Sequence, residues 1–187
     1  MKNAQRQEIE QKAENVLRES GAYRIPVPVD VVANHLKLTL QESIMREKIS
    51  GLLVVENKRG AVSYNAAHAQ VRQRFTIAHE IGHYILHVLP KPTLSRLFID
   101  RYVAYRSHEE TSNGDTNERE EIEANVFGAA LLMPAELVRE EIRRKGFDLD
   151  DEEDIDALAK RFSVSPSAMS YRLVNLGLVR YPDAIRA

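Results

Sequence analysis

Apolar residues recur at intervals of three and four positions near the start of the chain, which predicts an amphipathic helix over residues 4–19. The apolar stripe of this helix consists of Ile9, Ala13, Val16 and Leu17. Gly21 ends the pattern. Prolines then favour an extended chain over residues 25–29, because each disfavours helix in the residue before it. Asp30 is predicted to cap a short helix through Leu36.

Three short segments rich in β-branched and other apolar residues follow, and we interpret them as strands over residues 37–41, 50–56 and 60–64. The sequence Asn-Lys-Arg-Gly at 57–60 is typical of a turn and would join the last two strands as a hairpin. We therefore expect a small antiparallel sheet in this part of the chain.

A helical pattern returns over residues 69–89, and Pro90 ends it. Residues 91–117 mix basic and aromatic side chains with a polar loop, and we expect only partial order there. A further helix is predicted over residues 118–132, with Thr116 or Asn117 as its cap. Pro134 would then open a shorter helix through Arg144.

The end of the chain has the pattern of a helix-turn-helix, with helices over residues 155–162 and 166–176 around a turn at 163–165. The second helix offers several polar side chains for contact with DNA: Ser167, Ser170, Tyr171, Arg172 and Asn175. DNA binding requires a basic exposed face, yet this face has one arginine and seven of the nine residues from 148 to 156 are acidic. A structural or substrate-docking role is favoured over DNA binding.

The amino-acid composition limits the classes of protein to which the chain can belong. The chain has 187 residues, 43% hydrophobic and 29% charged, with a net charge of -2, as in a soluble globular protein. It contains no cysteine, so a metal would be held by histidines and carboxylates. The first residues contain no apolar signal region, and no apolar run reaches about 18 residues, so we expect a cytoplasmic protein without membrane spans.

The helix over 69–89 carries the sequence His79-Glu80-Ile81-Gly82-His83, which matches H-E-x-x-H. Residues four apart lie on one face of a helix, so His79 and His83 can both point a ring nitrogen at one ion. Glu80 sits beside that face, in the position of a general base. His87 continues the stripe. Eight residues rise about 12 Å along a continuous helix, however, so His79 and His87 cannot both bind the same ion.

The third ligand is expected from the helix over 118–132, which offers four glutamates: Glu118, Glu120, Glu121 and Glu123. Glu121 shares a stripe with Asn125 and Gly128, which combines a carboxylate, an amide and a small residue that permits close helix approach. Asn125 could accept a hydrogen bond from a ligand histidine. Glu120 shares a stripe with apolar residues, and Glu123 is predicted to face solvent.

The sequences Arg72-Gln73-Arg74-Phe75-Thr76-Ile77-Ala78-His79-Glu80-Ile81-Gly82-His83-Tyr84-Ile85-Leu86-His87 and Glu121-Ile122-Glu123-Ala124-Asn125-Val126-Phe127-Gly128-Ala129-Ala130-Leu131-Leu132-Met133-Pro134 closely resemble the ImmA/IrrE family of metallopeptidases. The resemblance implies a gluzincin-like zinc site whose third ligand is Glu121. It also implies an endopeptidase that cleaves a helix-turn-helix repressor encoded nearby and releases mobile-element, prophage or stress-response genes. The family often has alanine where this chain has Gly128.

Together these observations predict an α+β protein. Residues 1–135 would form a minimal zincin-like domain, and residues 136–187 a helical, helix-turn-helix-like unit. The metal would be Zn²⁺, held by His79, His83 and Glu121. Candidates for stabilising the oxyanion are Tyr84, Tyr102, Tyr105 and His108. The strand over 51–56 is a candidate edge for pairing with an extended substrate.

Two other functions are compatible with the sequence. The chain could be a non-proteolytic, zinc-stabilised regulator that binds a transcription factor or DNA, or the toxin of a toxin-antitoxin pair. Glu80 separates the peptidase from the regulator, because only the peptidase needs that carboxylate for its activity.

Overall fold

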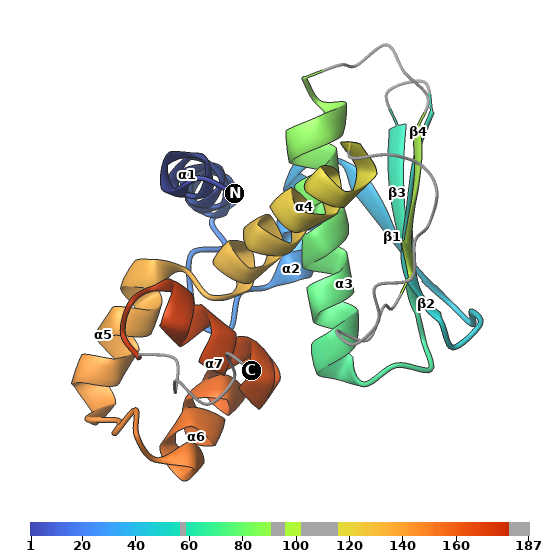
Figure 1. Ribbon diagram of the computed structural model, residues 1–187. Coiled ribbons are helices and arrows are strands. Elements are labelled where there is room, and N and C mark those ends of the chain that lie inside the picture. Colours follow the sequence, from blue (N-terminus) through green and yellow to red (C-terminus); the bar gives the residue numbers. More distant parts are fainter. Residues whose placement is uncertain (57–58, 91–95, 102–115, 180–187) are drawn as a thin grey trace.

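The computed structural model describes residues 1–56, 59–90, 96–101 and 116–179. A four-stranded sheet has helices on one of its faces, and a group of shorter helices follows at the C-terminal end (Figure 1). This arrangement confirms the expected α+β class, with a zincin-like domain and a helical unit. No described helix combines the length and the apolar composition needed to cross a lipid bilayer.

The sheet is mixed rather than antiparallel, which corrects the prediction. Its strands are β1 (Leu38–Ser43), β2 (Ile49–Glu56), β3 (Arg59–Asn65) and β4 (Arg96–Arg101), in the order β1-β3-β2-β4. The β2–β3 hairpin is antiparallel as predicted, but β1 lies beside β3 and pairs with it in parallel. The chain skips one position between β1 and β2, so β1 and β3 run in the same direction. Asn65 supports this crossing, because its Nδ2 donates to the Ile49 carbonyl at 2.9 Å.

Strand β4 was not expected, and it changes the role of β2. It pairs antiparallel with β2 on the side away from β3, so β2 is an interior strand with a partner on each side. The prediction that residues 51–56 form an open edge is therefore wrong. The apolar run of β4 is short and is flanked by charged residues in the sequence, a pattern typical of an edge strand.

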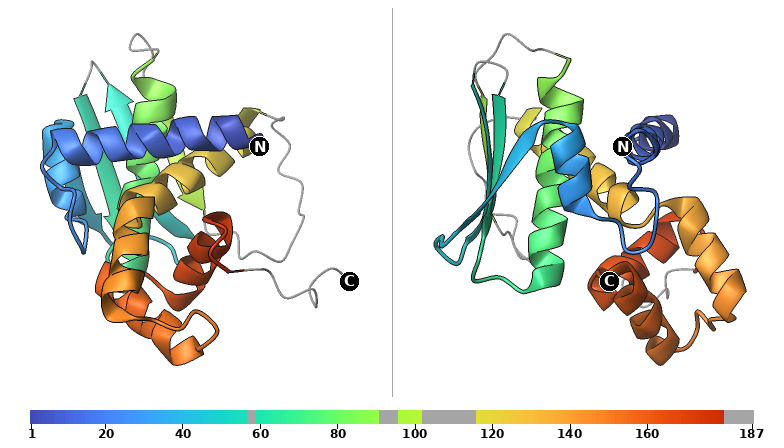
Figure 2. Two further views of the ribbon diagram at one scale, coloured as in Figure 1. Left: turned by 90° about the vertical axis from the view of Figure 1, so that its left-hand side faces the viewer. Right: turned by 180° about the vertical axis from the view of Figure 1, so that it is seen from behind.

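Helix α3 (Gln70–His83) lies against one face of the sheet and continues into a π-helix, η1 (Tyr84–Val88) (Figure 2). Together they cover the span predicted as one helix, but the last turn is wound differently, since Leu89 N donates to the Tyr84 carbonyl five residues earlier, at 2.9 Å. The interface is apolar, with fully or almost fully buried side chains from Leu53, Val55, Val62, Ile77 and Ile81. Single π-helical turns are frequent at functional sites.

Helix α4 (Thr116–Leu132) packs on α3, and α1 (Asn3–Glu19) packs on α4 (Figure 1). The stripe predicted for α1 is buried. Because α4 already begins at Thr116, both Thr116 and Asn117 lie in its first turn rather than ahead of it. The α3 and α4 backbones approach closely: a Cβ on Gly82 would lie 3.1 Å from the Ala124 carbonyl oxygen, and one on Gly128 would lie 3.2 Å from His79 N.

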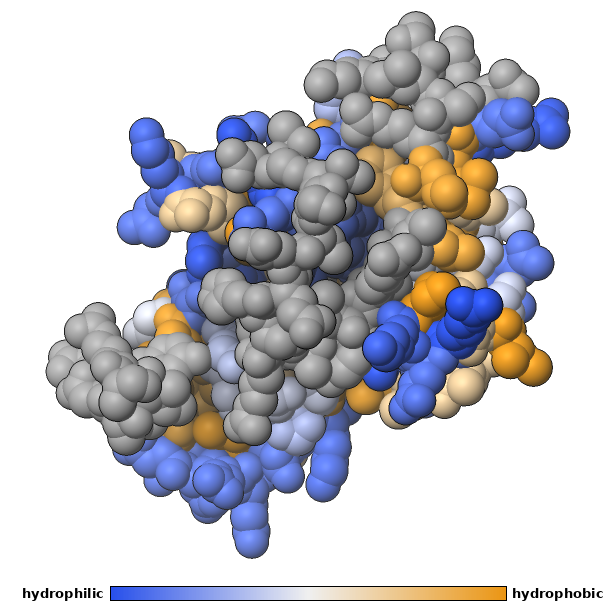
Figure 3. All heavy atoms as spheres, turned by 45° about the vertical axis from the view of Figure 1, so that its right-hand side comes forward, coloured by the Kyte–Doolittle hydropathy of each residue, from blue (hydrophilic) through white to orange (hydrophobic). Residues whose placement is uncertain are grey.

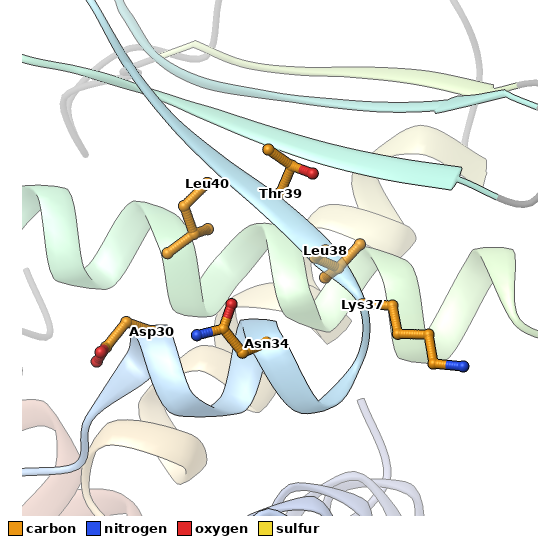
Figure 4. A pocket seen from close by; sticks show the side chains of 6 residues that line it. All are labelled: Asp30, Asn34, Lys37, Leu38, Thr39 and Leu40. Atoms are coloured by element: carbon orange, nitrogen blue, oxygen red, sulfur yellow. The ribbon is translucent and has the colours of Figure 1, made fainter.

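Helix α2 (Val29–His35) begins one residue before Asp30, with Pro28 at the cap position. Asp30 is therefore not the cap; it lies in the first turn, where its charge favours the helix dipole. The side of α2 that faces β1 borders an open hollow of about 510 Å³ (Figure 4). The lining residues are Asp30, Asn34, Lys37, Leu38, Thr39 and Leu40, so this hollow contains none of the predicted site residues.

The opposite face of the sheet has no described helix on it (Figure 2). Val54 of β2 and Leu97 of β4 are register neighbours, and their exposed fractions are 43% and 60%. Apolar side chains gather over this side of the molecule in the space-filling view (Figure 3).

The C-terminal helices are α5 (Ala135–Lys145), α6 (Glu152–Phe162) and α7 (Pro166–Asn175), close to the predicted spans. Local signals end and begin them: Gly146 has φ 70°, Asp151 accepts from Glu153 N at 2.9 Å, and Ser165 accepts from Ala168 N at 3.2 Å. Their core is apolar and fully buried, and includes Leu158, Phe162, Met169 and Leu173.

Arg172 of α7 is 3% exposed, which removes it from the candidate contacts with DNA. Its Nε donates to the Met133 carbonyl at 2.9 Å, and a terminal nitrogen donates to the Glu10 carboxylate of α1 at 2.7 Å. These bonds tie α7 to α1 and to the segment after α4, which both precede the boundary predicted between residues 135 and 136. The division into two domains at that point stays a prediction.

Candidate metal centre

His79 and His83 lie one turn apart on α3, and both side chains are almost completely buried. Their rings meet edge to face with centroids 4.6 Å apart, and the two Nε2 atoms are 3.0 Å apart. The spacing of the motif thus brings two ring nitrogens to one point, as the sequence predicted.

Glu121 reaches the same point from α4. Its Oε2 lies 3.2 Å from His79 Nε2, and its Oε1 lies 3.2 Å from His83 Nε2. Ligand atoms around a tetrahedral zinc ion are about 3.3 Å apart, since each lies about 2.0–2.1 Å from the metal. Among the described residues these three form a cluster that could hold a metal ion, and its dimensions and donor types fit zinc.

The protonation states also suit metal binding. Burial alone would raise the pKa of Glu121, but hydrogen bonds and charge interactions with His79 and His83 outweigh it and lower that pKa to about 2. Burial lowers the pKa of His83 below its ordinary value. An ionised carboxylate and a neutral imidazole are the forms that coordinate a metal.

Asn125 orients His79, as predicted from its place one turn after Glu121. His79 Nδ1 lies 3.1 Å from Asn125 Oδ1, so the ring donates through Nδ1–H to the amide oxygen. In the neutral form of the ring, which is the form that binds a metal, the lone pair of His79 is then on Nε2, the nitrogen next to Glu121. A partner of this kind fixes the tautomer and the ring direction of a ligand histidine.

His83 is held differently. Its Nδ1 is buried and has no hydrogen-bond partner among the described residues. Its ring instead stacks on Phe98 of β4, with centroids 4.5 Å apart and planes inclined by 26°. Sequence reasoning missed Phe98, although the apolar triplet at 97–99 between charged residues could have indicated a short strand.

Glu80 is fully buried between α3 and the sheet. A Cβ on Gly51 of β2 would lie 3.3 Å from Glu80 Oε1 and 2.3 Å from Thr76 Cγ2, so only glycine at position 51 lets β2 come this close to α3. The Glu80 carboxylate therefore lies against β2, without exposure to solvent. The role of Glu80 as a general base stays a prediction.

His87 lies outside the three-residue cluster. Its Nε2 is 3.3 Å from the Glu120 carbonyl oxygen and 3.9 Å from Glu123 Oε2. The sequence argument used the rise of a continuous α-helix, whereas the structure places His87 in the π-helical turn.

Glu123 does not face solvent, which corrects the prediction. Its side chain is 14% exposed, and its Oε1 accepts from Gln5 of α1 and from Arg119 Nε, the latter at 2.8 Å. The cause is the packing of α1 on this side of α4, which the local sequence of α4 does not reveal. Glu118 and Glu120 also lie outside the cluster.

The residue that stabilises the oxyanion is not identified by this geometry. The Tyr84 ring packs toward the sheet, with its Cε2 3.6 Å from where a Cβ on Gly60 would lie. Tyr102, Tyr105 and His108 lie outside the described residues.

Comparison with known proteins points the same way. Residues 33–174 match the family described as the IrrE N-terminal-like domain, a peptidase family. The radiation response metalloprotease IrrE of Deinococcus radiodurans is 34% identical to the chain over 116 residues. That stretch covers 62% of the chain and 31% of IrrE, so the chain aligns with about a third of the length of this relative.

Proposed function

Since the chain belongs to the ImmA/IrrE family of metallopeptidases, we propose that it is a zinc-dependent endopeptidase. The observation that carries this proposal is the triangle of His79 Nε2, His83 Nε2 and the Glu121 carboxylate, with sides of 3.0 to 3.2 Å. Two imidazoles and one carboxylate are a donor set typical of catalytic zinc, which keeps a fourth position open for water.

Zn²⁺, when bound, would polarise the scissile carbonyl and lower the pKa of water to about 7. The Glu80 carboxylate would accept a proton from the attacking water and later donate that proton to the leaving amine. The position of Glu80 directly after His79 in the H-E-x-x-H sequence of α3 supports this role.

The substrate proposed from the family resemblance is a helix-turn-helix repressor encoded nearby, whose cleavage in the cytoplasm would release mobile-element, prophage or stress-response genes. The relative from Deinococcus radiodurans is named a radiation response metalloprotease, which is compatible with a stress response. Strand β4 takes the role first considered for residues 51–56, since it is the outermost strand on the side where Phe98 touches His83. An extended segment of the substrate would pair with β4 as an added strand.

A Glu80→Gln variant tests the proposal. The amide cannot accept the proton, so cleavage of the repressor by the zinc-loaded protein should fall about 10²- to 10⁴-fold, while zinc content stays at the parental level. The fragments would be resolved on a gel and their masses measured. Glu118→Gln, which changes a glutamate outside the cluster, is the matched control and should cleave like the parent.

Equal cleavage by the parent and Glu80→Gln would contradict the role of Glu80. Absence of cleavage by the zinc-loaded parent would contradict the peptidase function and favour the alternative, a zinc-stabilised regulator that binds a transcription factor or DNA. The helix-turn-helix-like order of α6 and α7 is the observation behind that alternative. The burial of Arg172 argues against a regulator that binds DNA, because the only arginine of α7 is not available for contact. A toxin would be recognised by a neighbouring antitoxin gene.

A further inference from the structure

The two histidines of the cluster differ in what holds their rings. His79 has a hydrogen bond from Nδ1 to Asn125, whereas the buried Nδ1 of His83 has no such partner among the described residues. A histidine ligand whose second nitrogen makes no hydrogen bond lacks the usual restraint on its rotation about χ2. Something else must fix the direction of His83 Nε2.

Phe98 is placed to do so. Its ring lies nearly parallel to the His83 ring at 4.5 Å, whereas His87 lies 5.5 Å away at 54° and His79 meets the ring edge to face. A flat surface on one face of an imidazole restricts its rotation, because any turn about χ2 drives a ring edge into that surface. The contact also excludes water from the same face.

We infer that Phe98 is a positioning residue for the metal, and that the stack of Phe98 on His83 takes the place of the hydrogen bond that His79 donates to Asn125. The inference rests on the proposed metal site. Strand β4 then has a function besides pairing with β2, since it carries the Phe98 ring that orients His83. Leu97, its neighbour in the same strand, points to the opposite face of the sheet and is 60% exposed.

The test compares substitutions of Phe98 with Leu97→Ala. Zinc affinity is measured by competition with a chromophoric chelator, and the visible absorption spectrum of the Co²⁺ form reports ligand geometry. Phe98→Ala should weaken zinc binding about threefold to tenfold, the range expected for loss of an aromatic contact, and should alter the Co²⁺ spectrum. Leu97→Ala should leave both at the parental values.

Two further variants separate positioning from packing. Phe98→Leu keeps an apolar side chain but loses the flat ring, so its affinity should fall as in Phe98→Ala. Phe98→Tyr keeps the ring and should restore the affinity and the spectrum. If Phe98→Ala does not fold, the contrast between Phe98→Leu and Phe98→Tyr carries the same test.

The inference is overturned if Phe98→Leu binds zinc within twofold of the parent with an unchanged Co²⁺ spectrum, even if the stability of the metal-free protein falls. A parent that binds no zinc would overturn it as well, together with the proposed function. Zinc binding by the parent with no effect of Phe98→Leu would remove only the role of Phe98.

Discussion

The crossing of α3 and α4 and the C-terminal group α5–α7 are both made of helices, but they are held together by different means. At the crossing, glycines let the two backbones touch, and polar side chains of the site fill the space beside them. The helices of the C-terminal group are held mainly by local caps and by a buried apolar core. The difference teaches that the C-terminal helices are specified locally, whereas the metal site depends on contacts between segments about forty residues apart.

Arg172 is an exception to the local specification of the C-terminal helices, because it makes buried polar contacts with residues distant in the sequence. Replacing it by leucine would leave the Met133 carbonyl and the Glu10 carboxylate without their donor. We expect Arg172→Leu to lower the free energy of unfolding by about 3 kcal/mol, measured by urea denaturation.

The matched control is Arg161→Leu. Arg161 is 44% exposed at its ion pair with Glu141, so the loss should be below about 1 kcal/mol. Zinc affinity should be unchanged in both variants, since neither arginine belongs to the cluster. Equal losses of stability in the two variants would show that the buried contacts of Arg172 have no special weight.

A smaller loss of stability is expected when a glycine is replaced by alanine at the α3–α4 crossing or at the end of α5. Gly128→Ala would place a Cβ 3.2 Å from His79 N, so α4 has to move by a few tenths of an ångström and carry Glu121 with it. Gly146→Ala meets no atom within 4 Å but forces alanine into φ 70°. Each should cost about 1 kcal/mol of stability, the first by overpacking and the second by backbone strain.

The two glycine variants should differ in zinc binding. Gly128→Ala is expected to weaken it several-fold, up to about tenfold, as is usual when the support of a metal ligand is disturbed. Gly146→Ala should bind zinc like the parent, as measured by chelator competition. The same zinc affinity in both variants would mean that the crossing tolerates more movement than its close contacts indicate.

Much of the fold followed from local sequence signals. The apolar stripe of α1, the hairpin of β2 and β3, the start of α5 after Pro134 and the turn at 163–165 between α6 and α7 were all predicted from short-range patterns. The H-E-x-x-H spacing was also accessible, because His79 and His83 lie one helical turn apart. Asn125 was accessible as a partner for a ligand histidine, because it lies one turn after Glu121 on the same helix.

Apart from the starts of α2 and α4, the errors share one physical cause, since each concerns a contact between distant segments. The parallel pairing of β1 depends on which strand lies beside it, and the burial of Glu123 depends on α1. Arg172 has the pattern of a surface residue on its own helix until Glu10 and Met133 are placed next to it. Phe98 gains its meaning only when β4 joins the sheet over His83.

We propose that zinc is held by His79, His83 and Glu121, and the zinc-to-protein ratio of two glutamate variants tests this ligand set most directly. Glu121→Gln removes a charged ligand, whereas Glu123→Gln changes a carboxylate on the same helix that binds Gln5 and Arg119. After dialysis, the parent and Glu123→Gln should retain about one zinc ion per chain, and Glu121→Gln should retain almost none. Retention of zinc by Glu121→Gln, or loss of zinc from both variants alike, would contradict the assignment of Glu121 as the third ligand.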